Sequence, residues 1–338
     1  MNKRLGQQTV KLENAVNILA TAAVAGQKES QGPLSAHFDI IMENSEWGEA
    51  TWEKTESKMQ KSAVGRALEK AKVDVKDMKY IFAGDLLNQC ISSTFGLMNF
   101  EIPFLGVYGA CSTMAETMGL AAMSIDGGYA DFAVAVTSSH FCTAERQYRN
   151  PLEYGGQRTP TAQWTVTGSG AVVLSEKGKG PYITHFTSGK IVDLGIKDAN
   201  NMGAAMAPAA ADTLAAHFED TGRSPDFYDL IVSGDLGTVG KSIIIDLLHE
   251  KGFDISKNYD DCGCMIFDIE KQDMHAGGSG CGCGAVTLCG YIMDMIKMGK
   301  LKKVLFMGTG ALLSPTSTLQ GESIPSVAHA VAISAERE

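Results

Sequence analysis

The chain has 338 residues, with 29 Lys and Arg against 39 Asp and Glu, and a net charge of −10. Hydrophobic residues make up 44% and charged residues 20%, which excludes a disordered chain. The acidic balance argues against nucleic acid as a partner, because neutralising phosphates requires clustered cations. This length predicts two domains, or one body with two lobes.

No stretch of about 18 uninterrupted apolar residues is present, so we expect no helix that crosses a membrane. Lys3 and Arg4 precede a small apolar run at 15–26, which loosely resembles a signal peptide. Polar residues interrupt the approach to this run and it is rich in Ala, so we expect no signal peptide. The eight cysteines are too sparse for a disulfide scaffold and favour a reducing compartment.

Short apolar runs alternate with longer amphipathic segments along the chain, which is the pattern of an α/β protein. The elements expected in the first half are a helix over 54–72, strands over 80–83 and 102–107, a helix over 112–125 and a strand over 132–136. The elements expected in the second half are a strand over 229–232, a helix over 285–298 and a strand over 304–307.

The two halves carry a repeated signal. Gly-Asp-Leu stands at 84–86, after one expected strand, and again at 234–236, after another. This offset is too long for a solenoid and fits one duplicated lobe. Duplicated α/β lobes place their ligand cleft between the halves, at the carboxyl ends of the strands. We therefore expect domains at 1–180 and 181–338, with functional residues directly after strands.

Cys111 lies in the turn Gly-Ala-Cys-Ser-Thr at 109–113, between an expected strand and an expected helix. The small residues permit a tight turn, and the amides and dipole of the helix would lower the pKa of the thiol or hold an anion. A free cysteine is also commonly a small buried hydrophobe. The spacing alone leaves both interpretations open.

This turn, followed by a Met- and Ala-rich helix, resembles the nucleophile elbow of the thiolase-like condensing enzymes. Thr-Gly-Ser-Gly-Ala-Val-Val-Leu at 167–174 resembles a strand of ketoacyl synthase III. The similarity runs from about residue 80 to the carboxyl end. It implies an α/β, thiolase-like fold of two duplicated βαβαβαββ lobes in five layers, α-β-α-β-α, with Cys111 in the first lobe. It also implies a homodimer.

Longer segments resemble the stage V sporulation AD family of endospore-forming bacteria. The similar segments are 83–89, 143–147, 154–157, 206–213, 260–263 and 308–315. Members of that family bind dipicolinic acid (pyridine-2,6-dicarboxylate) and help to move it, with calcium, into the forespore and out at germination. The resemblance implies a non-enzymatic binding protein that is the soluble component of a spore membrane channel complex. It would lie at the forespore or spore inner membrane, held there by the other stage V A membrane proteins.

Condensing enzymes pair the cysteine with His and Asn, or two His, from the second lobe to stabilise developing charge. The resemblance places these partners after the strand 230–232 and near Gly278, but the chain has Ser-Gly-Asp at 233–235 and no side chain at 278. An anionic Asp235 would repel an oxyanion. His275 and His140 are the nearby imidazoles, and His275 would have to rotate inward. We therefore interpret Cys111 as a vestigial nucleophile.

The resemblance implies that the cleft between the two lobes binds the diacid dipicolinic acid. The expected ligand-binding residues are Cys111, Ser112, Ser138, Ser139, His140, Gly277, Gly278, Ser279 and Asp235. Helix amides at Cys111 and Ser112 would take one carboxylate, and Ser138, Ser139 and His140 the other. Glycines would let the backbone approach the ligand closely. This site requires Cys111, Ser138 and His140 to share one cavity, and it needs no cofactor.

Two Cys-x-Cys pairs, at 262–264 and 281–283, lack the spacing of a zinc knuckle, so we expect structural thiols and no metal site. The polar segment 146–163 is expected to form either a lid or a dimer contact. Two other functions stay open. One is an active condensing enzyme that acylates Cys111, and the other is a scaffold with a vestigial cleft.

Overall fold

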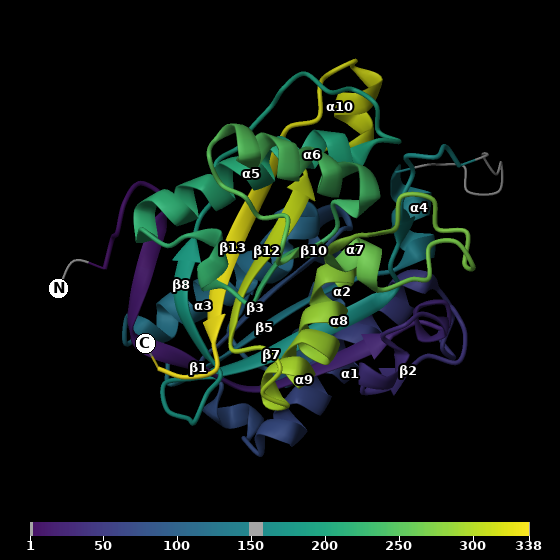
Figure 1. Cartoon of the computed structure of the whole chain (residues 1–338). Helices are drawn as coiled ribbons and strands as arrows, with labels where there is room; N and C mark the ends of the chain where they lie inside the picture. The colour runs from purple at the N-terminus through teal and green to yellow at the C-terminus, as the bar shows by residue number, and fades with distance from the viewer. Residues whose placement is uncertain (1–2, 149–157, 338) are drawn as a thin grey trace.

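The computed structural model describes residues 3–148 and 158–337 (Figure 1). The first half of the chain contains β1 (Thr9–Ala25), β2 (Ile40–Ile41), α1 (Trp52–Ala71), β3 (Tyr80–Asp85), α2 (Ile91–Leu97), β4 (Phe104–Gly106), α3 (Thr113–Asp126), β5 (Phe132–Ser139), α4 (Phe141–Tyr148), β6 (Trp164–Thr165) and β7 (Gly168–Ser175). The second half contains β8 (Tyr182–Thr187), α5 (Met202–Thr221), β9 (Leu230–Ser233), α6 (Gly237–Glu250), β10 (Tyr259–Asp261), α7 (Cys262–Met265), β11 (Gly278–Ser279), α8 (Cys281–Thr287), α9 (Met293–Lys297), β12 (Lys303–Ala311), α10 (Pro315–Leu319) and β13 (Ser326–Ser334).

The long strands form one sheet in the order β10-β9-β12-β13-β8-β1-β7-β5-β3-β4. β1 and β8 pair antiparallel at its centre and join the two halves. Outward from this pair, each half continues with two antiparallel pairings and then two parallel ones. Each half therefore has the order βαβαβαββ, and the expected fold class is confirmed. The boundary between residues 180 and 181 stays a prediction.

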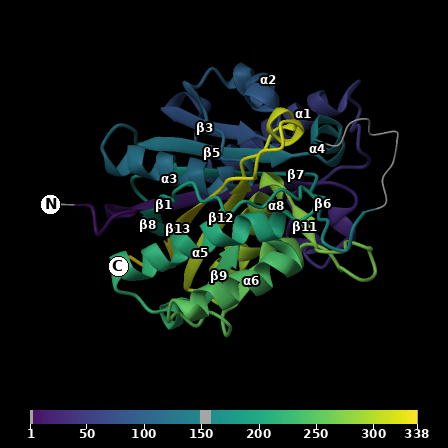
Figure 2. The same ribbon diagram turned by 90° about the horizontal axis from the view of Figure 1, so that it is seen from above.

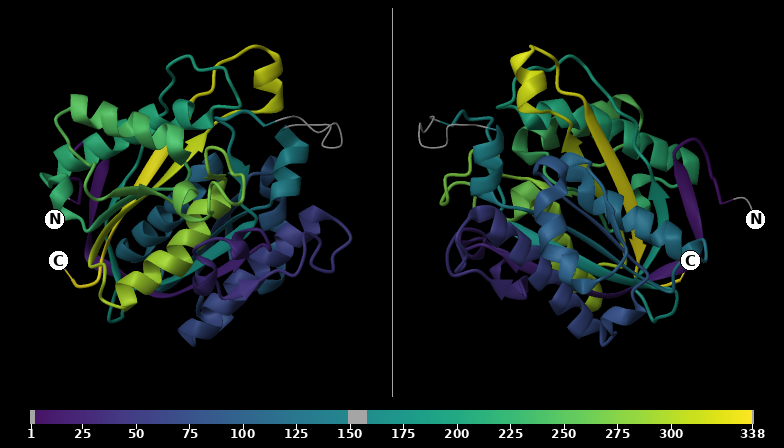
Figure 3. Two further views of the ribbon diagram at one scale, coloured as in Figure 1. Left: turned by 45° about the vertical axis from the view of Figure 1, so that its right-hand side comes forward. Right: turned by 180° about the vertical axis from the view of Figure 1, so that it is seen from behind.

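The helices form three layers around the two halves of the sheet (Figures 2 and 3). α1 covers the outer face of the first half, where Met59 and Val64 pack with Val134 and Val173. α5 and α6 cover the outer face of the second half. α3 and α8 lie between the halves, in a core shared with both. These layers place the carboxyl ends of strands from both halves around one central region.

Helix α1 shows how the sequence pattern produces this packing. The Thr51 hydroxyl caps the helix by accepting a hydrogen bond from the Lys54 amide at 3.3 Å. Met59, Ala63 and Ala67 recur every four residues and are fully buried, because that spacing places them on one face. The helix expected over 54–72 is thereby confirmed.

The helix expected over 285–298 is present but irregular. It begins earlier, at Cys281, and passes through a π-helical turn, Leu288–Ile292, before α9. At Gly290 a Cβ would lie 2.6 Å from the His37 carbonyl oxygen, so the irregular turn packs closely against another segment. Within residues 3–148 and 158–337, no helix is long and apolar enough to cross a bilayer.

Candidate functional site

The turn that carries Cys111 is held against the second half of the chain. Residues Ala110–Ser112 form a 3₁₀ turn ahead of α3, and Ala110 has a left-handed φ of 50°. The turn packs on β12 at Gly310, where a Cβ would lie 2.1 Å from the Gly109 carbonyl oxygen. A glycine in β12 is therefore required to seat the thiol between the halves.

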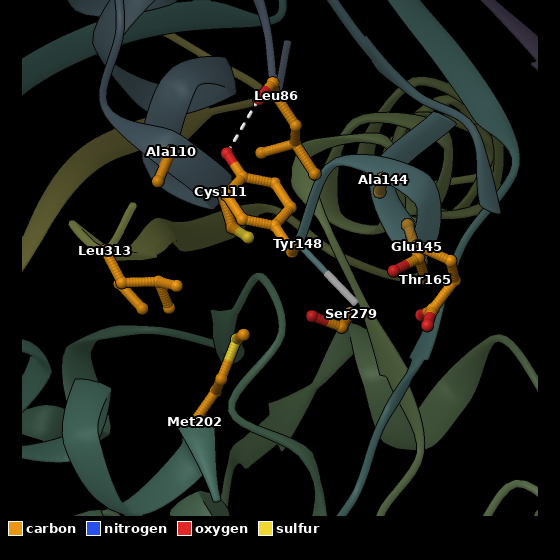
Figure 4. Close-up of a pocket in the computed structure, with 11 residues that line it drawn as sticks. Leu86, Ala110, Cys111, Ala144, Glu145, Tyr148, Thr165, Met202, Ser279 and Leu313 are labelled. Atoms are coloured by element: carbon orange, nitrogen blue, oxygen red, sulfur yellow. Dashed lines mark hydrogen bonds between the residues drawn. The ribbon is translucent and has the colours of Figure 1, made fainter. Parts of the chain in front are cut away.

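A cavity of about 50 Å³, partly open to solvent, lies over this thiol (Figure 4). The residues that line it are Leu86, Ala110, Cys111, Ala144, Glu145, Tyr148, Thr165, Met202, Ser279, Ala311 and Leu313. Most of its wall is apolar, and the described lining residues include no Lys, Arg or His. The Tyr148 hydroxyl donates to the Leu86 carbonyl oxygen at 2.7 Å.

Asp235 is fully buried directly behind the floor of this cavity. Its Oδ1 accepts a hydrogen bond from Thr309 Oγ1 at 2.7 Å, and its Oδ2 accepts from the Gly280 amide at 2.8 Å and from Ser279 Oγ at 3.3 Å. The Cys111 thiol is a further hydrogen-bond partner. Burial raises the pKa of Asp235 to about 7, although Thr309, Cys111 and Gly280 lower it.

The environment of Cys111 keeps its thiol protonated. Burial raises the pKa of this thiol well above its usual value, and the charge of Asp235 raises it further. The expectation that the following helix lowers this pKa is wrong, because desolvation and the neighbouring acid exceed the effect of the helix. A protonated thiol is a weak nucleophile.

Ser112 does not provide the expected anion site at the start of the helix. Its amide donates to the Gly109 carbonyl oxygen at 3.0 Å, and its hydroxyl donates to the same oxygen at 2.7 Å. The side chain is fully buried and does not line the cavity. Both donors of Ser112 are thus used within the turn that holds Cys111.

The comparison with known proteins places the chain among sporulation proteins. Residues 6–334 match the family described as stage V sporulation protein AD. The chain belongs to this family. It is 46% identical over 329 residues to stage V sporulation protein AD of Bacillus subtilis (strain 168), and the match covers 97% of each chain.

Solved structures similar to this member of the AD family have the thiolase-like fold. The 3-oxoacyl-[acyl-carrier-protein] synthase III from Aquifex aeolicus VF5 has a TM-score of 0.59, with 14% identity, over 95% of this chain and 100% of that one. OleA from Xanthomonas campestris, solved with bound lauric acid and lauroyl-CoA, has a TM-score of 0.60, also with 14% identity, over 95% and 99%. At this identity the likeness extends to the fold alone.

Ser138 and Ser139 lie near the floor but face away from the cavity. Ser138 Oγ donates to Glu56 Oε1 at 2.9 Å and accepts from Gln60 Nε2 at 2.8 Å. Ser139 Oγ donates to the Val166 carbonyl oxygen at 2.7 Å. Ser139 Oγ also accepts from the Gly282 amide of the second half at 3.0 Å. Both hydroxyls are thus fully buried in hydrogen bonds within the protein.

His140 lines a different cavity, of about 240 Å³, together with Lys28 and Trp164. Its Nε2–H donates to the Ser45 carbonyl oxygen at 2.9 Å, while Nδ1 accepts from the Cys142 amide at 3.2 Å. Burial lowers the pKa of His140, so the ring is neutral. The expectation that Cys111, Ser138 and His140 share one cavity is therefore wrong, because the hydrogen bonds of Ser138 and His140 turn them elsewhere. The diacid site expected from the sequence, with its second carboxylate at Ser138, Ser139 and His140, is not formed.

His275 does not replace the missing catalytic imidazole. Its Nδ1 lies 2.7 Å from the Thr159 carbonyl oxygen and its Nε2 lies 3.3 Å from Asp273 Oδ1. All seven histidines are in the described part of the chain, and none lines the cavity of Cys111.

The glycine run before α8 is required by packing. Gly277 has a φ of 106°, and a Cβ there would lie 2.6 Å from the Gly263 carbonyl oxygen. Gly278 pairs with Trp164 in the small β6–β11 sheet. Neither glycine lines the cavity, whereas the next residue, Ser279, does.

The cysteine pairs form no disulfides. Cys262, Cys281 and Cys283 are buried free thiols, and Cys264 is partly buried. Within the described ranges, no three His, Cys, Asp or Glu side chains converge as metal ligands.

The segment 146–163 lies only partly within the described residues, since 149–157 fall outside them, as does the motif at 154–157. At its end, Gln163 Nε2 donates to the Asp235 carbonyl oxygen at 2.7 Å and to the Gly278 carbonyl oxygen at 2.8 Å. Gln163 thereby connects the loop that carries Asp235 with the loop that leads to the cavity residue Ser279. Whether the segment is a lid or a dimer contact stays open.

Several cavity residues are missing from the sequence-based site. Leu86 follows β3 directly, Met202 begins α5, and Leu313 follows β12. Leu86 belongs to the repeated Gly-Asp-Leu signal, which could have been used to find it. The positions of Met202 and Leu313 depend on how the two halves pack.

Proposed function

We propose that the cavity above Cys111 binds dipicolinic acid without covalent chemistry, and that the protein handles this diacid, free or as its calcium chelate, during uptake into the forespore and release at germination. Membership of the AD family supports a role in sporulation. The apolar walls of the cavity suit a flat ring, and Cys111, Ser279 and Thr165 supply polar groups.

One observation favours ligand binding over acyl-transfer catalysis. The thiol of Cys111 faces the buried acid Asp235, where a condensing enzyme requires a hydrogen-bond donor for an oxyanion. The neighbouring acid also opposes formation of the thiolate. Attack by Cys111 and stabilisation of the resulting oxyanion are therefore both disfavoured at this site.

The assembly that follows from this proposal has two parts. We expect the protein to reach the spore inner membrane through the other stage V A membrane proteins. We also expect a homodimer, because β4 lies at a free end of the described sheet and its Phe104 and Leu105 are 41% and 43% exposed. A second copy related by a two-fold axis presents the same apolar edge.

Titration of dipicolinic acid by calorimetry tests the proposal, with and without calcium, on wild type, Leu313→Trp and Leu312→Trp. Leu313 lines the cavity, whereas its half-buried neighbour Leu312 does not, so Leu312→Trp is the matched control. We expect wild type and Leu312→Trp to bind, and Leu313→Trp to lose at least about tenfold in affinity because the indole fills the cavity.

Incubation with acyl-coenzyme A separates binding from acyl transfer. We expect the intact mass of the protein to stay unchanged. An acyl adduct on Cys111 with turnover would establish an active condensing enzyme instead. An absence of both dipicolinic acid binding and an acyl adduct would favour a scaffold with a vestigial cleft.

A further inference from the structure

We propose that the cavity takes up its diacid together with one proton, which is held by Asp235 behind the Cys111 thiol and the Ser279 hydroxyl. This inference rests on the proposed function and concerns the same site. It makes the affinity for the diacid dependent on pH through a residue that does not itself line the cavity.

The contacts of Asp235 connect its charge to the cavity. Ser279 Oγ lies 3.3 Å from Asp235 Oδ2, and the Cys111 thiol is hydrogen-bonded to the same carboxyl group. Both side chains also line the cavity, as Figure 4 shows. Two polar groups of the cavity floor therefore share their hydrogens with Asp235.

When Asp235 is ionised, Cys111 and Ser279 present only hydrogen-bond acceptors to the cavity. A carboxylate accepts hydrogen bonds only, so it draws the thiol hydrogen of Cys111 and the hydroxyl hydrogen of Ser279 away from the cavity. The cavity then presents sulfur and oxygen lone pairs to a ligand. An anionic ligand meets acceptors in front of a negative charge, which is unfavourable in a buried setting.

The protonated form reverses this polarity. Asp235 still accepts from Thr309 Oγ1 at 2.7 Å and from the Gly280 amide at 2.8 Å. Its own O–H can donate to Ser279 Oγ, which frees the Ser279 hydroxyl hydrogen for a ligand carboxylate. The Cys111 thiol is held less strongly, because a neutral carboxyl group is a weaker acceptor than a carboxylate. One proton therefore removes a negative charge and supplies donors together.

The groups around Asp235 leave this proton on Asp235. The titratable side chains that face Asp235 from the neighbouring elements are Cys111, Cys262, Cys281, Cys283 and Asp261. Burial raises the pKa of each of the four thiols well above its usual value, so they stay neutral. Burial raises the pKa of Asp261 as well, whereas its hydrogen bonds from Ser233 Oγ and from the amides of Gly237 and Leu236 lower it. The charge of Asp261 favours the protonated form of Asp235.

Calorimetric titration of dipicolinate in calcium-free buffers from pH 6.5 to 8.5 tests the coupling. Both ligand carboxyls are ionised throughout this range, because carboxylic acids ordinarily titrate near pH 4. We expect the Kd of wild type to rise about tenfold between pH 7.5 and 8.5, and binding at pH 8 to take up close to one proton, measured in buffers of different ionisation enthalpy.

Asp235→Asn is the decisive variant, because its side chain is nearly isosteric with Asp235 and carries neither a negative charge nor a titrating proton. We expect its Kd to change less than about twofold over the same range, and we expect Asp260→Asn, whose half-exposed acid pairs with Lys241 at 2.7 Å, to retain the wild-type slope. If Asp235→Asn fails to fold, the proton uptake of wild type decides.

The outcomes separate this inference from the proposed function. Binding with a constant Kd and no proton uptake would overturn the coupling and leave dipicolinate binding intact, as would an unchanged slope in Asp235→Asn. A complete lack of binding in wild type at every pH would overturn the proposed function and the coupling with it.

Discussion

Asp85 and Asp235 stand at the ends of equivalent strands, β3 and β9, in the two halves of the chain, and both are fully buried. Asp85 accepts from the Leu87 amide at 2.9 Å and from the Ser93 amide and hydroxyl at 2.8 and 2.6 Å. All these donors belong to the first half and none lines the cavity of Cys111. Asp85 therefore secures a loop.

Asp235 differs because its partners come from several parts of the chain. Ser279 and Cys111 are both cavity walls, so the protonation of Asp235 changes what a ligand meets. The duplication thus places a buried acid at the same position in each half of the chain. The residues around each acid determine whether it stabilises the fold or affects a binding site.

The largest expected effect is the loss of folding stability when Asp85 is replaced. Asp85→Ala leaves three buried donors of Leu87 and Ser93 without an acceptor, so we expect the free energy of unfolding to fall by about 3 kcal/mol or more. Urea unfolding measures this loss. Asp85→Asn keeps an acceptor oxygen and is expected to lose less. A stable Asp85→Ala with altered dipicolinate affinity would break the comparison.

The next effect uses the acid that neighbours Asp85. Burial, and then the charge of Asp85, raise the pKa of Glu56 to about 8. Between pH 6 and 8 the folded protein therefore binds more protons at Glu56 than the unfolded chain does, and stability falls as pH rises. We expect Glu56→Gln to remove about 2 kcal/mol of this fall, measured by urea unfolding at both pH values.

The matched control for Glu56→Gln is Glu69→Gln, because Glu69 lies on the same helix with its side chain 69% exposed. This variant is expected to retain the pH dependence of wild type. Equal slopes for all three proteins would show that Glu56 is ionised in the folded state.

Much of the fold follows from local patterns in the sequence. The four-residue spacing of Met59, Ala63 and Ala67 predicts α1, and the repeated Gly-Asp-Leu segment marks corresponding strand ends. These signals are local because a helix face and a buried strand each impose their own period. The fold class is confirmed for this reason, while the ends of the elements shift by a few residues.

The site was less predictable, because a position after a strand does not determine which way a side chain points. Neighbouring residues on a strand face opposite sides, so Ser138 turns to Glu56 and Ser139 to the Val166 carbonyl. Cys111, Asp235 and Ser279 do come together as a group. The high pKa of Cys111 arises from burial between the halves, which no local pattern encodes.

The smallest expected effect tunes Asp235 through the strand beside it. Thr309 Oγ1 donates to Asp235 Oδ1 at 2.7 Å and lowers the pKa of this acid. Thr309→Val removes the donor and preserves the shape, so the pKa of Asp235 rises. A hydrogen bond to a charged group contributes about 1.5 kcal/mol, so we expect the pH at which dipicolinate affinity begins to fall to increase by about one unit.

Thr137→Val provides the matched control for Thr309→Val, because Thr137 lies on β5, the equivalent strand of the first half, and donates to the Gly84 carbonyl oxygen at 2.8 Å. It removes a buried threonine hydroxyl that donates to a backbone carbonyl, without touching Asp235. An equal shift in both variants would trace the pH dependence to general loosening of the fold. A shift in Thr309→Val alone would locate the titrating group behind the cavity of Cys111.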